Sequence, residues 1–223
     1  MAKRFFFVTV LVLVSVACAV SAGEAETKEV GAAPDAEGEV MDKRMSDLQT
    51  LLERNQQFAG EYKSGLTILP KFLTIVLTCV DARIDPAHFL GLELGDALVF
   101  RNAGGRVTDD LELDLGVLWM LGAGMAGENF PGLSLAVVQH TDCGLERLAK
   151  PEMAAALTKR LRLEQAQIDG LVNTDHAQRI REDIERLRKS PLVPKGLIVS
   201  GHIYRVENGT IEEVVAPAPL ERM

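Results

Sequence analysis

Two short segments of this chain carry residues whose types and spacing can do chemistry. The first reads Cys79-x-Asp81-x-Arg83, so a carboxylate and a guanidinium follow closely after a thiol. The second reads His140-x-x-Cys143 and adds an imidazole and another thiol. Two sulfur ligands and one nitrogen ligand suit Zn²⁺ and leave its fourth tetrahedral position for water, substrate or a carboxylate. A zinc site opened in this way is a centre for hydration or hydrolysis.

The apolar runs of the chain predict strands of a mostly parallel sheet. A continuous β-branched and apolar run is typical of a strand that is covered on both faces. Runs of this kind lie at 72–79, 97–101, 133–140 and 197–204. The Asn208-Gly209 pair predicts a hairpin turn into a short antiparallel edge strand at 210–215.

Helical patterns lie before and between these runs. Apolar residues at helical spacing predict helices at 44–59, from the Thr108 cap to the Gly122/Gly124 pair, from Pro151 through Ile168, and from the Thr174 cap to Ser190. Strands that alternate with helices imply right-handed crossovers. The predicted fold class is therefore α/β, a mostly parallel β-sheet flanked by helices with a short antiparallel edge strand.

The predicted strands bring the two chemical segments together. Cys79 ends the first strand and His140 ends the third. In open α/β sheets, ligands bind beyond the carboxyl ends of the strands. We therefore expect the thiols and the imidazole to meet at one edge of the sheet. A structural disulfide between Cys79 and Cys143 is the alternative for an exported protein with two cysteines.

The N-terminal segment has the layout of a secretory signal peptide over residues 1–22, with Lys3 and Arg4 before an apolar run and small residues after it. A retained anchor, or a lipoprotein modified at Cys18, is the alternative. Residues 23–43 are rich in acids and are expected to form a flexible linker. The globular domain is then 44–223, and the protein is expected to be exported, to a periplasm, the medium or a lumen, with no stable membrane span after cleavage.

Composition excludes one class of partner. The formal net charge is −8, and it becomes −10 when Lys3 and Arg4 leave with the signal peptide. Nucleic-acid binding requires a basic face, so this acidic chain is not expected to bind nucleic acid.

The motifs together resemble the β-class carbonic anhydrases. The matching residues are Cys79-x-Asp81-x-Arg83, Arg101-Asn102-Ala103-Gly104 and His140-x-x-Cys143-Gly144, within roughly residues 45–215. They are most similar to the shorter branch that reads Cys-Met-Asp-Ala-Arg, with Val80 in place of methionine. The resemblance implies one Zn²⁺ per subunit, bound by Cys79, His140 and Cys143. It also implies reversible hydration of carbon dioxide to bicarbonate and a proton.

The resemblance also implies roles for neighbouring residues. Asp81 would accept a hydrogen bond at the open zinc position, and Arg83 would orient Asp81 and keep it ionised. Asp81 could also close the site as a fourth ligand. Gly104 and Gly105 would line the pocket beside the metal, in a turn where glycine permits close backbone approach.

In similar proteins an N-terminal arm embraces a neighbouring subunit, so a homodimer or a higher homo-oligomer is expected, with helix 44–59 as the arm.

Other interpretations of the same motifs stay open. Carbon disulfide and carbonyl sulfide hydrolases carry much the same site and are the nearest alternative activity. A zinc-stabilised binding protein with a permanently closed site is a third possibility.

Overall fold

The structure is a computed structural model that describes residues 36–172 and 174–223. The chain divides into two compact units, Met1–Lys63 and Ser64–Met223. The expected signal peptide at 1–22 lies outside the described residues, so export stays a prediction from the sequence. Within the described part of the chain, no helix has the length and apolar character needed to cross a membrane.

Helix α1 (Ala36–Glu61) makes up most of what is described of the first unit. It was expected at 44–59 but begins at Ala36, so residues 36–43 of the predicted flexible linker are helical. Acidic side chains near a helix N-terminus interact favourably with the helix dipole, so Glu39 in the first turn favours this early start. The remainder of the predicted linker, 23–35, lies outside the described residues.

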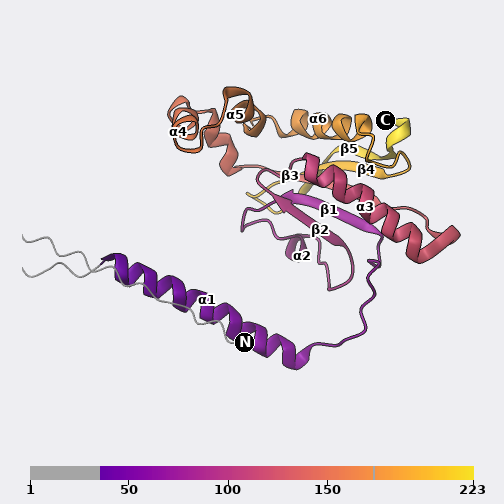
Figure 1. Cartoon of the computed structure of the whole chain (residues 1–223), viewed down its shortest axis with the longest axis horizontal. Coiled ribbons are helices and arrows are strands. Elements are labelled where there is room, and N and C mark those ends of the chain that lie inside the picture. The colour runs from indigo at the N-terminus through magenta and orange to yellow at the C-terminus, as the bar shows by residue number, and fades with distance from the viewer. Residues whose placement is uncertain (1–35, 173) are drawn as a thin grey trace, which may run out of the picture. The chain divides into compact units, whose positions relative to one another are not determined.

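The second unit is built on a five-stranded sheet in the order β2-β1-β3-β4-β5 (Figure 1). Its strands are β1 (Thr74–Cys79), β2 (Leu98–Asn102), β3 (Ser134–His140), β4 (Ile198–Tyr204) and β5 (Ile211–Pro219). The pairings β1–β2, β1–β3 and β3–β4 are parallel, and only β4–β5 is antiparallel among the described residues. The predicted fold class is confirmed, with each parallel strand within two residues of its expected bounds. The edge strand β5 continues past its predicted end at 215 to Pro219.

Helices cover the two faces of this sheet. The remaining α-helices are α2 (Pro86–Phe89), α3 (Asp109–Ala126), α4 (Pro151–Leu161), α5 (Gln165–Leu171) and α6 (His176–Lys189). Short 3₁₀ turns are η1 (Gly127–Asn129), η2 (Gly144–Ala149) and η3 (Leu220–Arg222). Right-handed crossovers place α3 and α6 on one face and α2 on the other (Figure 1). The main core packs α3 and α6 against β1, β3 and β4 through buried Leu, Ile and Val side chains.

The helix boundaries of the second unit differ from the predictions at three points. Helix α3 is capped by Thr108 as expected, but it runs through the Gly122/Gly124 pair to Ala126. A Cβ at position 122 would lie 2.5 Å from the Phe130 ring, so this glycine permits close packing and does not end the helix. The pattern from Pro151 through Ile168 forms two helices, because Arg162 adopts a left-handed conformation at φ +57° between them.

The last helix is capped one residue later than predicted. The side chain of Asp175, not that of Thr174, accepts a hydrogen bond from the backbone N–H of Gln178. Both residue types are good N-caps, so sequence alone does not separate adjacent candidates.

Candidate metal centre

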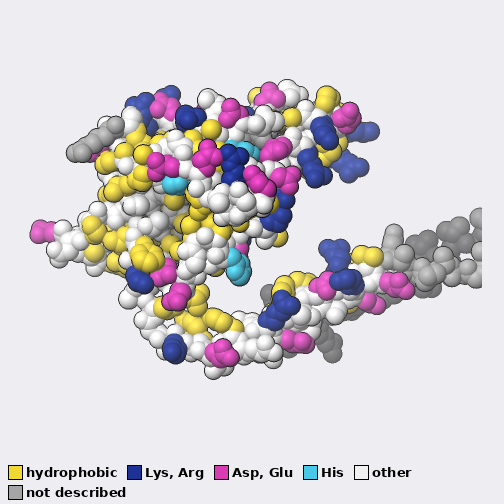
Figure 2. Space-filling model, turned by 180° about the vertical axis from the view of Figure 1, so that it is seen from behind, with side chains coloured by type: hydrophobic (Ala, Val, Ile, Leu, Met, Phe, Trp, Pro, Cys, Tyr) yellow, Lys and Arg dark blue, Asp and Glu magenta, His cyan; other side chains and the backbone are white. Residues whose placement is uncertain are grey.

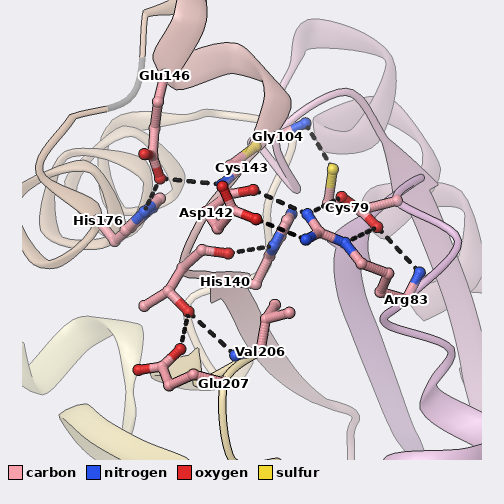
Figure 3. A network of polar contacts seen from close by, with 12 residues as sticks. Cys79, Arg83, Gly104, His140, Asp142, Cys143, Glu146, His176, Val206 and Glu207 are labelled. Atoms are coloured by element: carbon pink, nitrogen blue, oxygen red, sulfur yellow. Dashed lines mark hydrogen bonds and ion pairs between the residues drawn. The ribbon is translucent and has the colours of Figure 1, made fainter.

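The three candidate ligands come together at the carboxyl edge of the sheet. Cys79 is the last residue of β1, His140 is the last residue of β3, and Cys143 precedes η2. Their ligand atoms all lie within 4.8 Å of one another, and the three residues are at most 5% exposed. Cys79 and Cys143 are free thiols in the structure, so no disulfide occupies the cluster. Figure 3 shows the three side chains converging from separate segments.

His140 presents one ring nitrogen to this cluster. Its Nδ1 lies 2.9 Å from the carbonyl oxygen of Thr141, which accepts a hydrogen bond only if Nδ1 carries the proton. The other nitrogen, Nε2, is buried and has no hydrogen-bond partner among the described residues. Metal-binding histidines commonly donate their second ring N–H to a carbonyl in this way. The unpartnered Nε2 is therefore an observation that favours a metal in the cluster.

Thr141, which orients the histidine, is itself held in place. Its backbone N–H donates to Tyr204 O at 3.1 Å. Its hydroxyl donates to Glu207 at 2.7 Å and accepts from the Val206 N–H at 3.0 Å (Figure 3). The end of β4 and the turn that follows it thus fix the carbonyl that orients His140.

The two thiols differ in pKa. A hydrogen bond with the Cys143 thiol, acting against burial, lowers the pKa of Cys79 to about 4. The same hydrogen bond, together with burial, raises the pKa of Cys143 above its ordinary value. The backbone N–H of Gly104 also donates to Cys79 Sγ at 3.3 Å. Burial lowers the pKa of His140, but Cys79, the Thr141 carbonyl and the charge of Asp81 together raise it above its ordinary value.

Arg83 links Asp81 to a second carboxylate. Its Nε and Nη2 donate to the two oxygens of Asp81 at 3.0 and 2.8 Å, and its backbone N–H donates to Asp81 at 2.9 Å. Its Nη1 donates to Asp142 Oδ2 at 2.6 Å, and Nη2 also reaches Asp142 O at 2.8 Å. These hydrogen bonds hold the pKa of Asp81 well below its usual range. Asp81 is therefore ionised, with both oxygens engaged by Arg83.

A small cavity opens beside the cluster. Its volume is about 210 Å³, and its lining combines cluster residues with apolar neighbours: Cys79, Val80, Asp81, Ala103, Gly104, Cys143, Gly144 and Leu145. Gly104 lines this cavity as expected, but Gly105 does not. A Cβ at position 105 would lie 3.0 Å from the Cys79 backbone nitrogen, so Gly105 packs against the end of β1 instead. Its φ of +61° also favours glycine.

Larger cavities lie elsewhere. One of about 640 Å³ is bounded by η2, α4, α5 and the start of α6, and it contains no member of the cluster. Its walls are mostly apolar, and among the described residues they include no group of candidate metal ligands. The small cavity is therefore the candidate site, because it alone of these adjoins the buried thiols.

Comparison with known proteins identifies the family. A family model described as carbonic anhydrase matches residues 74–211. The chain belongs to the β-class carbonic anhydrase family. The match spans the strands and loops that carry Cys79, His140 and Cys143. The finer assignment to the shorter branch stays a prediction from the sequence.

Relatives named for different activities have similar sequence identities to this chain. A carbon disulfide hydrolase from Acidianus sp. is 31% identical over 155 residues, covering 59% of this chain and 72% of that protein. Beta-carbonic anhydrase 1 from Mycobacterium tuberculosis is 27% identical over 163 residues, covering 73% of this chain and 94% of that protein. The carbonic anhydrase structure from Streptococcus mutans is 35% identical, with a TM-score of 0.63 and coverage of 75% and 96%.

The residues present fit the zinc ion that this carbonic anhydrase family implies. Two buried thiols and an unpartnered imidazole nitrogen supply the donor set that tetrahedral zinc prefers. Backbone groups of Thr141 and Gly104 orient the His140 ring and the Cys79 sulfur. The three ligand atoms are left facing one another (Figure 3).

Sequence reasoning missed several neighbours of the cluster. Asp142 lies inside the His140-x-x-Cys143 segment, yet spacing alone does not assign it to Arg83. Its φ of +53° is a further feature that spacing cannot reveal. Glu146 accepts from the Cys143 N–H and from His176, each at 3.0 Å, and only the fold brings His176 there.

Zinc binding should depend on His140 and not on the partly buried His202. We expect His140→Gln to lower zinc affinity by at least about 10-fold, because one of three protein ligands is lost. His202→Gln on the adjacent strand β4 is the control, since His202 bonds to Ser200 and lies outside the cluster. Zinc content after dialysis, measured by mass spectrometry, gives the comparison. Equal zinc content in the two variants would contradict the assignment.

Proposed function

We propose that this chain is a zinc-dependent carbonic anhydrase that reversibly hydrates carbon dioxide to bicarbonate and a proton. The observation that carries this proposal is the buried cluster of Cys79, His140 and Cys143, whose two cysteines line a small cavity together with Asp81. Family membership supports an enzyme, and the choice among the reactions of the family is our inference.

Each residue of the site has a proposed task. Cys79, His140 and Cys143 would hold zinc, which when bound supplies a Lewis acid that makes water nucleophilic near neutral pH. Asp81 would accept a hydrogen bond from the attacking water and fix its lone pair toward the substrate. Arg83 would hold Asp81 in place and keep it charged, because it binds both carboxylate oxygens.

The cavity suits a small apolar substrate. Val80, Ala103 and Leu145 supply apolar surface beside the thiols, and the volume of about 210 Å³ leaves room for a triatomic gas.

Hydrolysis of carbon disulfide or carbonyl sulfide is the second candidate. The similarity to the Acidianus carbon disulfide hydrolase supports this reaction. That protein is 31% identical in sequence to this chain, and the Mycobacterium tuberculosis carbonic anhydrase is 27% identical. Carbon disulfide is also linear, triatomic and apolar, so the cavity lining does not separate the two substrates.

Stopped-flow measurement of carbon dioxide hydration tests the first candidate. Protein from residue 23 onward should accelerate hydration, and removal of zinc by a chelator should abolish the effect until zinc is returned. The same preparation should release little hydrogen sulfide from carbon disulfide. Hydrogen sulfide release without hydration would favour the second candidate. Bound zinc with neither activity would indicate a closed, non-catalytic site.

Asp81→Asn should separate catalysis from metal binding. The asparagine side chain keeps the shape of aspartate and one oxygen acceptor but loses the negative charge. We therefore expect zinc to stay bound while kcat falls by about 100-fold or more. Asp85→Asn is the control, because Asp85 is partly exposed, caps α2, and can be replaced there by asparagine. Full activity of Asp81→Asn would show that Asp81 has no role in turnover.

We also propose that the protein is a homodimer or a higher homo-oligomer. Apolar side chains gather on the face of the second unit that Figure 2 shows. Helix α3 exposes Leu113, Val117, Met120 and Leu121, and helix α1 exposes Met45, Leu48, Leu52 and Phe58. Exposed apolar patches of this kind commonly mark interfaces between proteins.

Light scattering after size exclusion tests the assembly. The measured mass should be at least twice that of one chain at micromolar concentration. An active species with the mass of a single chain would contradict the proposal.

A further inference from the structure

A buried ion pair outside the candidate site joins the loop behind Cys79 to helix α6. Arg106 Nε and Nη2 donate to the two oxygens of Asp183 at 2.8 and 3.0 Å. The Asp183 side chain is 2% exposed and that of Arg106 is 16% exposed. The mechanism proposed above uses neither residue.

The backbone of Arg106 closes the loop that carries Gly104. The Arg106 N–H donates to Asn102 Oδ1 at 2.8 Å, and Asn102 Nδ2 donates back to Arg106 O at 2.8 Å. The Gly105 N–H also donates to Asn102 O at 3.2 Å. This loop is therefore a closed unit between β2 and Arg106. Within it, the Gly104 N–H reaches Cys79 Sγ at 3.3 Å, so a shift of Arg106 would move that donor.

Asp183 contacts the strand of the candidate histidine as well. Its Oδ2 accepts from Gln139 Nε2 at 3.4 Å, and Gln139 directly precedes His140 in β3. The backbone N–H of Val107 also binds this carboxylate. Arg106 Nη1 further donates to Gly170 O of α5 at 3.2 Å. One carboxylate on α6 thus connects the loop of Gly104 to the end of β3.

The stability gained from this pair is expected to be small. Burial raises the pKa of Asp183 even with Arg106 beside it, so the charged form is costly in this environment. Buried ion pairs are often no more stabilising than apolar residues of similar size. What the pair supplies is a fixed geometry, because the guanidinium binds both carboxylate oxygens in a single orientation.

We propose that Arg106 and Asp183 are positioning residues of the metal centre, which hold the Gly104 N–H against Cys79 Sγ and fix the end of β3. They thereby set the zinc affinity of the cluster and the electron donation from the Cys79 sulfur. This inference rests on the zinc site of the proposed function but not on which substrate is hydrated.

The test compares Asp183→Asn, Arg106→Gln and the double variant Arg106→Gln/Asp183→Asn. Zinc affinity is measured by competition with a chromogenic chelator, and the sulfur-to-metal charge-transfer band is recorded with Co²⁺ in place of zinc. Each single variant should bind zinc about 10-fold more weakly and shift the band, as expected when a group that orients a ligand is lost. The double variant should recover part of the zinc affinity and part of the band position. Its glutamine and asparagine side chains can hydrogen-bond to each other without a buried charge.

Leu187→Ala is the control for lost stability. Leu187 is fully buried one turn further along α6, in the main core and away from the cluster. This variant should unfold at a lower temperature yet keep the zinc affinity and Co²⁺ spectrum of the unmodified protein. If Asp183→Asn does not fold, Arg106→Lys replaces it. Lysine keeps the charge without the two-point contact and should still weaken zinc binding.

Unchanged zinc affinity and an unchanged Co²⁺ spectrum in the single variants would overturn the inference and leave the pair a structural contact. These readouts need no turnover, so a failure of the unmodified protein to hydrate carbon dioxide would refute the proposed activity alone. A failure of the unmodified protein to bind zinc at all would refute both.

Discussion

The parallel pairing of β1 with β3 is the constraint on which the metal centre depends. Thr78 lies opposite Val138, and its hydroxyl donates to the Val138 carbonyl at 2.8 Å in a fully buried position. This register ends β1 at Cys79 while β3 continues to His140. A slip of one residue would turn every side chain of the strand to the other face and separate the thiol from the imidazole.

The polypeptide orients the three ligand residues and leaves their ligand atoms facing one another. Backbone groups orient the ligands, as the Thr141 carbonyl does for His140 and the Gly104 N–H does for Cys79. Paired charges lie around them, with Arg83 between Asp81 and Asp142. In a low-dielectric site, such fixed contacts are stronger than in water, and an unpartnered buried nitrogen is costly. A bound metal would relieve that cost, so the orphaned Nε2 and the free thiols have one common explanation.

Much of this arrangement follows from the sequence, and the exceptions have physical reasons. Strand bounds were predictable because β-branched runs buried on both faces leave a continuous apolar signal, as in β1. The convergence of Cys79 and His140 followed from their strand-end positions. By contrast, the contact of Asp183 with Arg106 joins residues 77 positions apart and depends on the packing of α6, which no local pattern encodes. The predictions for Gly122 and Gly105 were wrong because their close approaches to Phe130 and β1 exist only in the folded chain.

X-ray absorption at the zinc edge would test the central claim most directly, on protein from residue 23 onward that has been purified with its metal. The account predicts two sulfur scatterers at about 2.3 Å and one imidazole nitrogen at about 2.0–2.1 Å, with one further light atom. The sulfur signal should fall by half in Cys143→Ser if that variant still retains metal. Absence of zinc, or a coordination shell without sulfur, would contradict the assignment of Cys79, His140 and Cys143 as the metal ligands.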